Sequence, residues 1–199
     1  MKPQAFIFIG RSGCGKGTQV KLLMEFLAKK DPSIQTLYIA TGNELREFIK
    51  EPLITYTQKK CKELYDVGGL QPEFLAVGMW VNRFFRDFDG TQHAIMDGMP
   101  RKLHEAGVLH SCMDFYGFEK PWVINIDISK EESRKRLLSR KRFDDNEAEI
   151  KRRLDWYETD VVPTLGYYDG NPRYNFLRIP GERSIEEIHV DIVKKSGLA

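Results

Sequence analysis

The segment at residues 10–18, Gly-Arg-Ser-Gly-Cys-Gly-Lys-Gly-Thr, restricts the possible folds of this chain more than any other feature. It follows a short apolar run at residues 5–9, which is typical of a buried parallel strand. It precedes apolar residues at helical spacing that continue to an Asp-Pro pair at residues 31–32. The sequence therefore predicts a strand, a tight glycine-rich loop and a helix in direct succession.

A loop with this composition can surround an anionic phosphate group. Its four glycines allow the backbone N–H groups to turn inward without Cβ clashes, and the helix that follows adds the positive end of its dipole. Lys16 is placed to reach the outer phosphates, and Thr18 to meet a magnesium ion or the α-phosphate. The alternative, a glycine-rich turn with a solvated lysine, does not account for the strand and helix on either side. We therefore expect nucleotide phosphates to contact Gly13, Cys14, Gly15, Lys16, Gly17 and Thr18.

Strand-like and helix-like segments alternate along the rest of the chain. This alternation implies a parallel sheet that is covered by helices on both faces. In such sheets ligands bind beyond the carboxyl ends of the strands, where Gly10, Thr41, Asp97 and Gly181 all fall. Further strands are predicted at residues 37–40, 94–96, 122–128 and 175–179. Helices are predicted at residues 42–50, 103–115, 131–140, 146–167 and 184–195, with two more between residues 51 and 84.

The composition restricts the partners that the chain can bind. Lys and Arg number 31 and Asp and Glu number 29, which gives a net charge of +2. The chain therefore lacks the excess of basic residues that is typical of a nucleic-acid-binding or membrane-surface protein. The three cysteines form no CxxC pair, which suits a reducing compartment. No apolar run is long enough to cross a membrane. We expect a cytoplasmic monomer that binds small-molecule nucleotides, no nucleic acid and no membrane.

Four segments, in order and at matching spacing, resemble the adenylate kinase family. Residues 10–19 are similar to the family's P-loop variant, in which a glycine separates the lysine from the threonine. Residues 41–46, TGNELR, are similar to the family's TGDxLR segment, and residues 97–101, DGMPR, to its DGFPR segment. Residues 136–154 resemble the arginine-bearing stretch around the family's lid.

The resemblance implies a P-loop α/β fold of three layers, α/β/α, with a five-stranded parallel sheet. Residues 1–199 would form one P-loop kinase domain, with a small helical insertion at residues 41–71 that binds the nucleoside monophosphate (NMP). Residues 139–147 would form a vestigial lid, because a single residue separates Arg140 from Arg142. The implied activity is transfer of the terminal phosphate of ATP, with Mg²⁺, to an NMP. AMP is the favoured acceptor, and GMP or a pyrimidine monophosphate is the alternative acceptor. The alternative function is that of a non-catalytic nucleotide-binding protein with the same fold.

Positive charge carries most of the implied chemistry, since phosphoryl transfer depends mainly on positioning and on neutralisation of charge. A helical wheel places Arg153 at the edge of the buried face of its helix and Arg152 nearly opposite. Asp97 follows an apolar run, so its carboxylate should face the P-loop and hold Mg²⁺ through water. The implied catalytic residues are Lys16, Arg101, Arg140, Arg142 and Arg153.

Both nucleotides have implied contacts outside the P-loop. By resemblance, Arg136 stacks on the ATP adenine and the loop at Gly181 contacts it through its backbone. Glu105 occupies the position where the family usually places a glutamine that contacts the AMP base. An ionised carboxylate can only accept hydrogen bonds, which in isolation suits guanine or cytosine better than adenine. The implied acceptor-binding residues are Thr41, Arg46, Leu70, Gln71, Gly98, Arg101 and Glu105.

Overall fold

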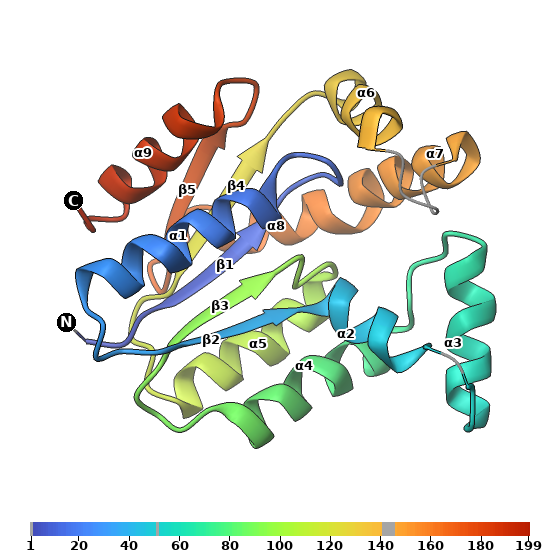
Figure 1. The fold of residues 1–199 in the computed structure, drawn as a ribbon, viewed down its shortest axis with the longest axis horizontal. Coiled ribbons are helices and arrows are strands. Elements are labelled where there is room, and N and C mark those ends of the chain that lie inside the picture. Colours follow the sequence, from blue (N-terminus) through green and yellow to red (C-terminus); the bar gives the residue numbers. More distant parts are fainter. Residues whose placement is uncertain (1, 51, 141–145) are drawn as a thin grey trace.

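The computed structural model describes residues 2–50, 52–140 and 146–199. Their five strands form one parallel sheet in the order β2-β3-β1-β4-β5, which confirms the expected sheet (Figure 1). The order reverses at β1, so the carboxyl end of β1 opens onto the crevice where such sheets bind ligands. The strands are β1 (Ala5–Ile9), β2 (Thr36–Ala40), β3 (His93–Asp97), β4 (Trp122–Asp127) and β5 (Asn175–Pro180).

Helices cover both faces of this sheet, which gives the three layers expected from the sequence (Figure 1). On the N-terminal side of the chain are α1 (Lys16–Lys30), α2 (Thr41–Phe48), α3 (Tyr56–Asp66) and α4 (Glu73–Asp87). The others are α5 (Leu103–Phe115), α6 (Lys130–Arg140), α7 (Glu147–Trp156), the π-helix η1 (Tyr157–Val161), α8 (Val162–Tyr168) and α9 (Ile185–Lys195). In the described part of the chain, no helix is both long and apolar enough to cross a membrane.

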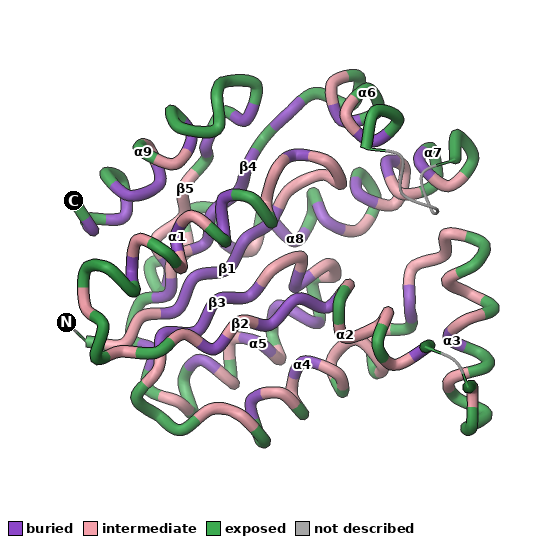
Figure 2. Tube along the Cα trace, viewed as in Figure 1, coloured by how far each residue is buried: buried purple, intermediate pink, exposed green. Residues whose placement is uncertain are grey.

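The alternation of side chains along the strands divides the core into two clusters. Phe6 and Phe8 of β1 pack against α1 and α9, whereas Ile7 and Ile9 point to the opposite face and pack with α4, α5 and α8. All of β1 is buried, as Figure 2 shows, and each large apolar side chain contributes roughly 1.5–3 kcal/mol by leaving water. This two-sided burial fixes the end of β1, and with it the start of the glycine-rich loop.

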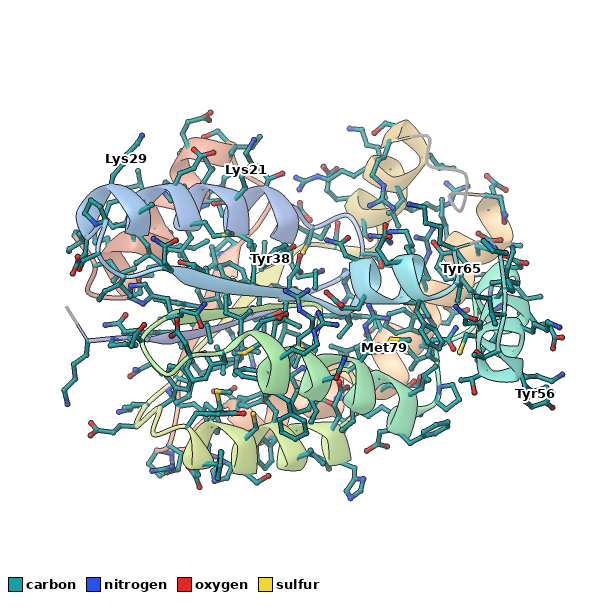
Figure 3. The ribbon with its side chains drawn as sticks, turned by 60° about the horizontal axis from the view of Figure 1, so that its bottom comes forward. Lys21, Lys29, Tyr38, Tyr56, Tyr65 and Met79 are labelled. Carbon is teal, nitrogen blue, oxygen red and sulfur yellow. The ribbon has the colours of Figure 1, made fainter. Side chains whose placement is uncertain are left out.

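The segment from α2 to α3 projects beyond the sheet at the end where the strands terminate (Figure 1). Thr55 caps α3 by accepting a hydrogen bond from the backbone N–H of Gln58, whose side chain bonds back to the backbone of Thr55. The helix is mostly exposed (Figure 2), and Figure 3 places Tyr56 at its outer end and Tyr65 nearer to α2. A capping box thus stabilises the start of α3, and Cys61 is its one buried residue.

The region predicted as one helix, residues 146–167, contains a change of helical type. Asn146 caps α7 at the expected start by accepting from the backbone N–H of Glu149. One turn, Tyr157–Val161, is a π-helix, and α8 continues beyond it. The predicted apolar stripe still holds, since Ile150, Leu154, Tyr157 and Val161 are all buried. Single π turns widen a helix by one residue and are frequent at functional sites.

Candidate active site

The glycine-rich loop has the backbone conformation of an anion cradle. Gly13 and Gly15 have φ angles of 81° and 98°, which side-chain-bearing residues rarely adopt. A Cβ on Gly10 would lie 2.5 Å from the carbonyl oxygen of Ile126. Only glycine therefore allows the start of the loop to pass this close to β4. The first turn of α1 contains no acidic residue, and no described side chain caps it. Its N–H groups and positive dipole end are thus available to a phosphate.

Lys16 lies inside this cradle. Its Nζ donates hydrogen bonds to the carbonyl oxygens of Gly10 at 2.7 Å and Arg11 at 3.0 Å. Cys14 Sγ is 3.6 Å from the same Nζ, and the Cys14 side chain is only 1% exposed. The thiol therefore packs against the base of the loop, and the ammonium group is held where phosphates would enter.

The side chain of Arg11 connects the glycine-rich loop to the π turn. Its Nε donates to the carbonyl of Ile128 at 2.9 Å, and its Nη1 forms an ion pair with Glu158. The guanidinium carbon lies 4.5 Å from the centre of the Tyr157 ring, a cation–π distance. The backbone carbonyl of Arg11 accepts a hydrogen bond from Lys16. The contacts of the Arg11 side chain therefore also fix one of the two carbonyls that hold the lysine.

Asp97 and Thr18 offer oxygen atoms near the loop. Asp97 ends β3, and its Oδ2 would lie 4.0 Å from a Cβ on Gly17. The hydroxyl of Tyr38, on β2 beneath α1 (Figure 3), donates to that oxygen at 3.1 Å. Among the described residues, no three His, Cys, Asp or Glu side chains cluster as a metal site. Two oxygen ligands fit Mg²⁺, which keeps water and phosphate ligands and needs few from the protein.

Arg136 and Gly181 come together although 45 residues separate them. Arg136 Nη2 donates to the carbonyl of Gly181 at 3.0 Å, and Nε forms an ion pair with Glu132 at 2.6 Å. A Cβ on Gly181 would lie 2.7 Å from Ile126, so the loop after β5 needs glycine to approach β4. The structure thus places the two residues expected at the ATP adenine side by side.

The residues expected to bind the acceptor converge at the ends of β2 and β3. Thr41 Oγ1 donates to the carbonyl of Gly98 at 3.2 Å, and Arg101 Nε donates to the same carbonyl at 2.9 Å. The Arg101 guanidinium carbon lies 5.3 Å from the centre of the Trp156 ring. Burial lowers the pKa of Arg101, which nevertheless carries its charge at neutral pH. Arg46 donates to Asn43 at 2.5 Å, so it is held at the mouth of this region.

Glu105 is almost fully buried, with 2% of its surface exposed. Its Oε1 accepts from the indole N–H of Trp80 at 3.2 Å, and its Oε2 from the backbone N–H of Arg101 at 2.6 Å. Burial raises the pKa of Glu105, although the N–H donors and the charge of Arg101 act in the opposite direction. Glu105 thus lines a small pocket beside these residues, and its two hydrogen bonds fix its orientation.

One cleft connects these regions. Arg153 lines this cleft, whereas Arg152, the residue before it on α7, is exposed. Leu70 lines only the smaller pocket that adjoins the cleft. Arg142, and residues 141–145 of the expected lid, lie outside the described residues. The site residues that line the large cleft are Gly13, Gly15, Lys16, Gly17, Thr18, Arg46, Gln71, Asp97, Gly98, Arg101, Arg136, Arg140 and Arg153.

Several aromatic residues belong to the site although the sequence analysis did not select them. Tyr38 and Trp156 line the cleft, and Trp80 holds Glu105. Trp156 lies one turn after Arg153 on the same helix, so its place on the cleft face could have been read from the helical spacing. Tyr38 and Trp80 gave no such signal, because their contacts depend on which strands and helices become neighbours.

Comparison with known proteins agrees with this geometry. A family model described as adenylate kinase matches residues 8–172. The chain belongs to the adenylate kinase family. Adenylate kinase 1 of Nostoc sp. is 36% identical over 182 residues, which cover 92% of both chains. The adenylate kinase of Leptospira biflexa is 34% identical over 94% of this chain and 97% of its own, and that of Corynebacterium urealyticum is 31% identical over 92% and 93%. As a member of this family, the chain is a phosphotransferase.

In this adenylate kinase family member, Glu105→Gln is expected to lower the free energy of unfolding by about 1–3 kcal/mol. A carboxylate offers two acceptor oxygens and an amide only one. The amide oxygen can keep the shorter bond from the Arg101 backbone, which leaves the indole N–H of Trp80 facing an NH₂ group. Chemical denaturation of both proteins measures the change. In a Trp80→Phe background, which lacks the indole donor, the same substitution should cost clearly less, and an equal cost would contradict this account.

Proposed function

We propose that the protein is an adenylate kinase that transfers the terminal phosphate of ATP to AMP and so forms two ADP. The observation that carries the proposal is the single cleft that joins the P-loop, the arginines of α6 and α7, and the acceptor residues after β2 and β3. A kinase for two nucleotides needs both phosphate groups in one space with cations around them. We assign residues 41–71 as the acceptor-binding insertion and residues 139–147 as a short lid, and we propose that the enzyme acts as a monomer.

The P-loop and the arginines have different roles in this reaction. The N–H groups of the loop and Lys16 bind the ATP phosphates, while Arg136 and Gly181 hold its adenine. Arg46 and Arg101 bind the phosphate of AMP and orient one of its oxygens for attack on the terminal phosphorus. Arg140 and Arg153, with Arg142, neutralise the charge that spreads over the transferring group. Thr18 and Asp97 would hold Mg²⁺, which would supply further positive charge to the ATP phosphates.

A coupled assay of ADP formation with AMP, GMP, CMP and UMP tests the proposed acceptor. We expect kcat/KM to be at least about tenfold higher for AMP than for any other monophosphate, because one mismatched polar contact in a dry pocket costs about 1–3 kcal/mol. A higher kcat/KM for GMP or CMP would overturn the assignment of AMP. No phosphoryl transfer to any of the four would overturn the proposed function itself.

A further inference from the structure

Arg11 is the only charged residue of the glycine-rich loop besides Lys16, but its side chain does not line the cleft. Only 15% of that side chain is exposed, because it packs against the π turn η1 and the segment that follows β4. In Figure 1 the loop between β1 and α1 lies beside the helical segment that runs from α7 to α8. The charge of Arg11 is therefore directed at the protein and not at a bound phosphate.

The guanidinium group of Arg11 is held both along its edge and on its face. Nε donates to the backbone carbonyl of Ile128 at 2.9 Å, and Nη1 forms an ion pair with Glu158. The ring of Tyr157, which is 3% exposed, has its centre 4.5 Å from the guanidinium carbon. A planar group with N–H bonds in fixed directions can make these three contacts at once, whereas the ammonium group of a lysine is a compact point charge.

The backbone carbonyl of Arg11 belongs to the turn that would surround a phosphate. It accepts hydrogen bonds from Nζ of Lys16 at 3.0 Å and from the backbone N–H of Cys14 at 3.2 Å. The next carbonyl, that of Ser12, accepts from the hydroxyl of Ser133 on α6 at 2.5 Å. The first half of the loop is thus fixed by other elements at two adjacent residues, and one of these, Arg11, also holds Lys16.

The π turn that Arg11 contacts continues directly from the helix that carries Arg153. Tyr157 is the first residue after α7, and Arg153 lies one turn before it. Arg153 and Lys16 both line the cleft. A shift of the π turn relative to the loop would therefore change the distance between these two cations. Such distances matter in catalysis, because a misplacement of about 1 Å can lower a rate about 100-fold.

We infer that Arg11 is a positioning residue for phosphoryl transfer, because its side chain connects the loop to the π turn and so fixes the spacing between Lys16 and Arg153. The inference rests on the proposed function, in which these two cations act on the same transferring group. The contribution of Arg11 then depends on the shape of its side chain and not on its charge alone. Since the spacing matters most in the transition state, its loss should lower kcat more than the affinity for ATP.

The first test compares Arg11→Lys with Arg11→Met, which both remove the planar group, while only the first keeps the charge. Both should lower kcat about 10- to 100-fold and weaken ATP binding, measured by calorimetry, by less than about fivefold. The calorimetric stoichiometry gives the fraction of protein that binds ATP, and kcat is referred to that fraction. An unchanged kcat in Arg11→Lys, or a loss of ATP affinity as large as the loss of kcat, would overturn the inference.

The same substitution in a Lys16→Ala background tests the spacing itself. One of the two cations is then absent, so Arg11→Lys should lower kcat by less than about threefold, and an undiminished loss would contradict the inference. Arg173→Lys is the matched control. Arg173 also forms an ion pair with an acidic residue of a distant element, Asp114 on α5, but it does not line the cleft. This variant should leave kcat within about twofold.

Hydrogen exchange of the backbone amides, followed by NMR, separates the inference from the proposed function because it requires no substrate. Arg11→Lys should speed exchange of the Cys14 amide by at least about fivefold, and Arg173→Lys should leave it unchanged. Unchanged exchange in Arg11→Lys would show that the side chain does not fix the loop and would overturn the inference. If exchange is faster in Arg11→Lys but the parent transfers no phosphate, the contact between loop and π turn is supported and the proposed function is refuted.

Discussion

Replacing Lys16 with alanine is expected to lower kcat by at least about 100-fold. Its ammonium group is held by the carbonyls of Gly10 and Arg11 at the inner wall of the P-loop, within reach of phosphates bound to the loop. Loss of one positioned cation from a site where charge develops typically costs two to three orders of magnitude. Steady-state rates of ADP formation at saturating ATP and AMP measure the effect.

Lys29→Ala is the control for this substitution. Lys29 has the same charge and lies on the same helix, but it is exposed near the C-terminal end of α1 and projects away from the sheet (Figure 3). Its removal should change kcat by less than about twofold, since an exposed charge at this distance is screened. Similar rates for the two variants would show that the P-loop lysine does not act on the phosphates.

A second large effect is expected for Arg153→Ala, which should lower kcat by about 100-fold or more. Arg153 lines the cleft that also contains Lys16, whereas Arg152 on the same helix is exposed. Only the side chain in the cleft can neutralise charge on the transferring phosphoryl group. Arg152→Ala removes the same charge from the adjacent position and should leave kcat within about twofold. If the two variants lose activity equally, the assignment of α7 to the catalytic face is wrong.

The five strands could be predicted because each one carries its own signal. Each is a short, mainly apolar run. The inner strands β3, β1 and β4 are almost wholly buried on both faces, which requires that pattern, whereas the edge strands β2 and β5 are only partly buried and include polar residues. The order of the strands could not be predicted in this way, since parallel neighbours are selected by contacts between distant segments. Tyr38 and Asp97 illustrate the limit, because their hydrogen bond exists only when β2 lies beside β3.

The π turn at Tyr157–Val161 was also beyond prediction from local sequence. No glycine or proline occurs within it, and the apolar stripe continues across it. Arg11 contacts this turn through both Tyr157 and Glu158. The turn is therefore associated with a contact between segments almost 150 residues apart, which a helical pattern does not contain.

The glycines of the P-loop were the most predictable part of the site. Their role is set by the backbone, and the φ angles at Gly13 and Gly15 are those that glycine alone adopts readily. The directions in which polar side chains point were harder to predict from the sequence. The sequence predicted Gln71 and Glu105 as acceptor-binding residues. The hydrogen bond from Gln71 to the carbonyl of Cys61, and the one from Trp80 to Glu105, can be seen only in the packed structure.

The most direct test of the central claim follows the terminal phosphate itself. The enzyme is incubated with Mg²⁺, AMP and ATP that carries a radioactive label in its terminal phosphoryl group, and the products are separated. The account predicts that the label appears in ADP, since it moves to the former AMP, and that little appears as inorganic phosphate. Recovery of the label as inorganic phosphate, or its retention in ATP at the level of a Lys16→Ala control, would contradict the account.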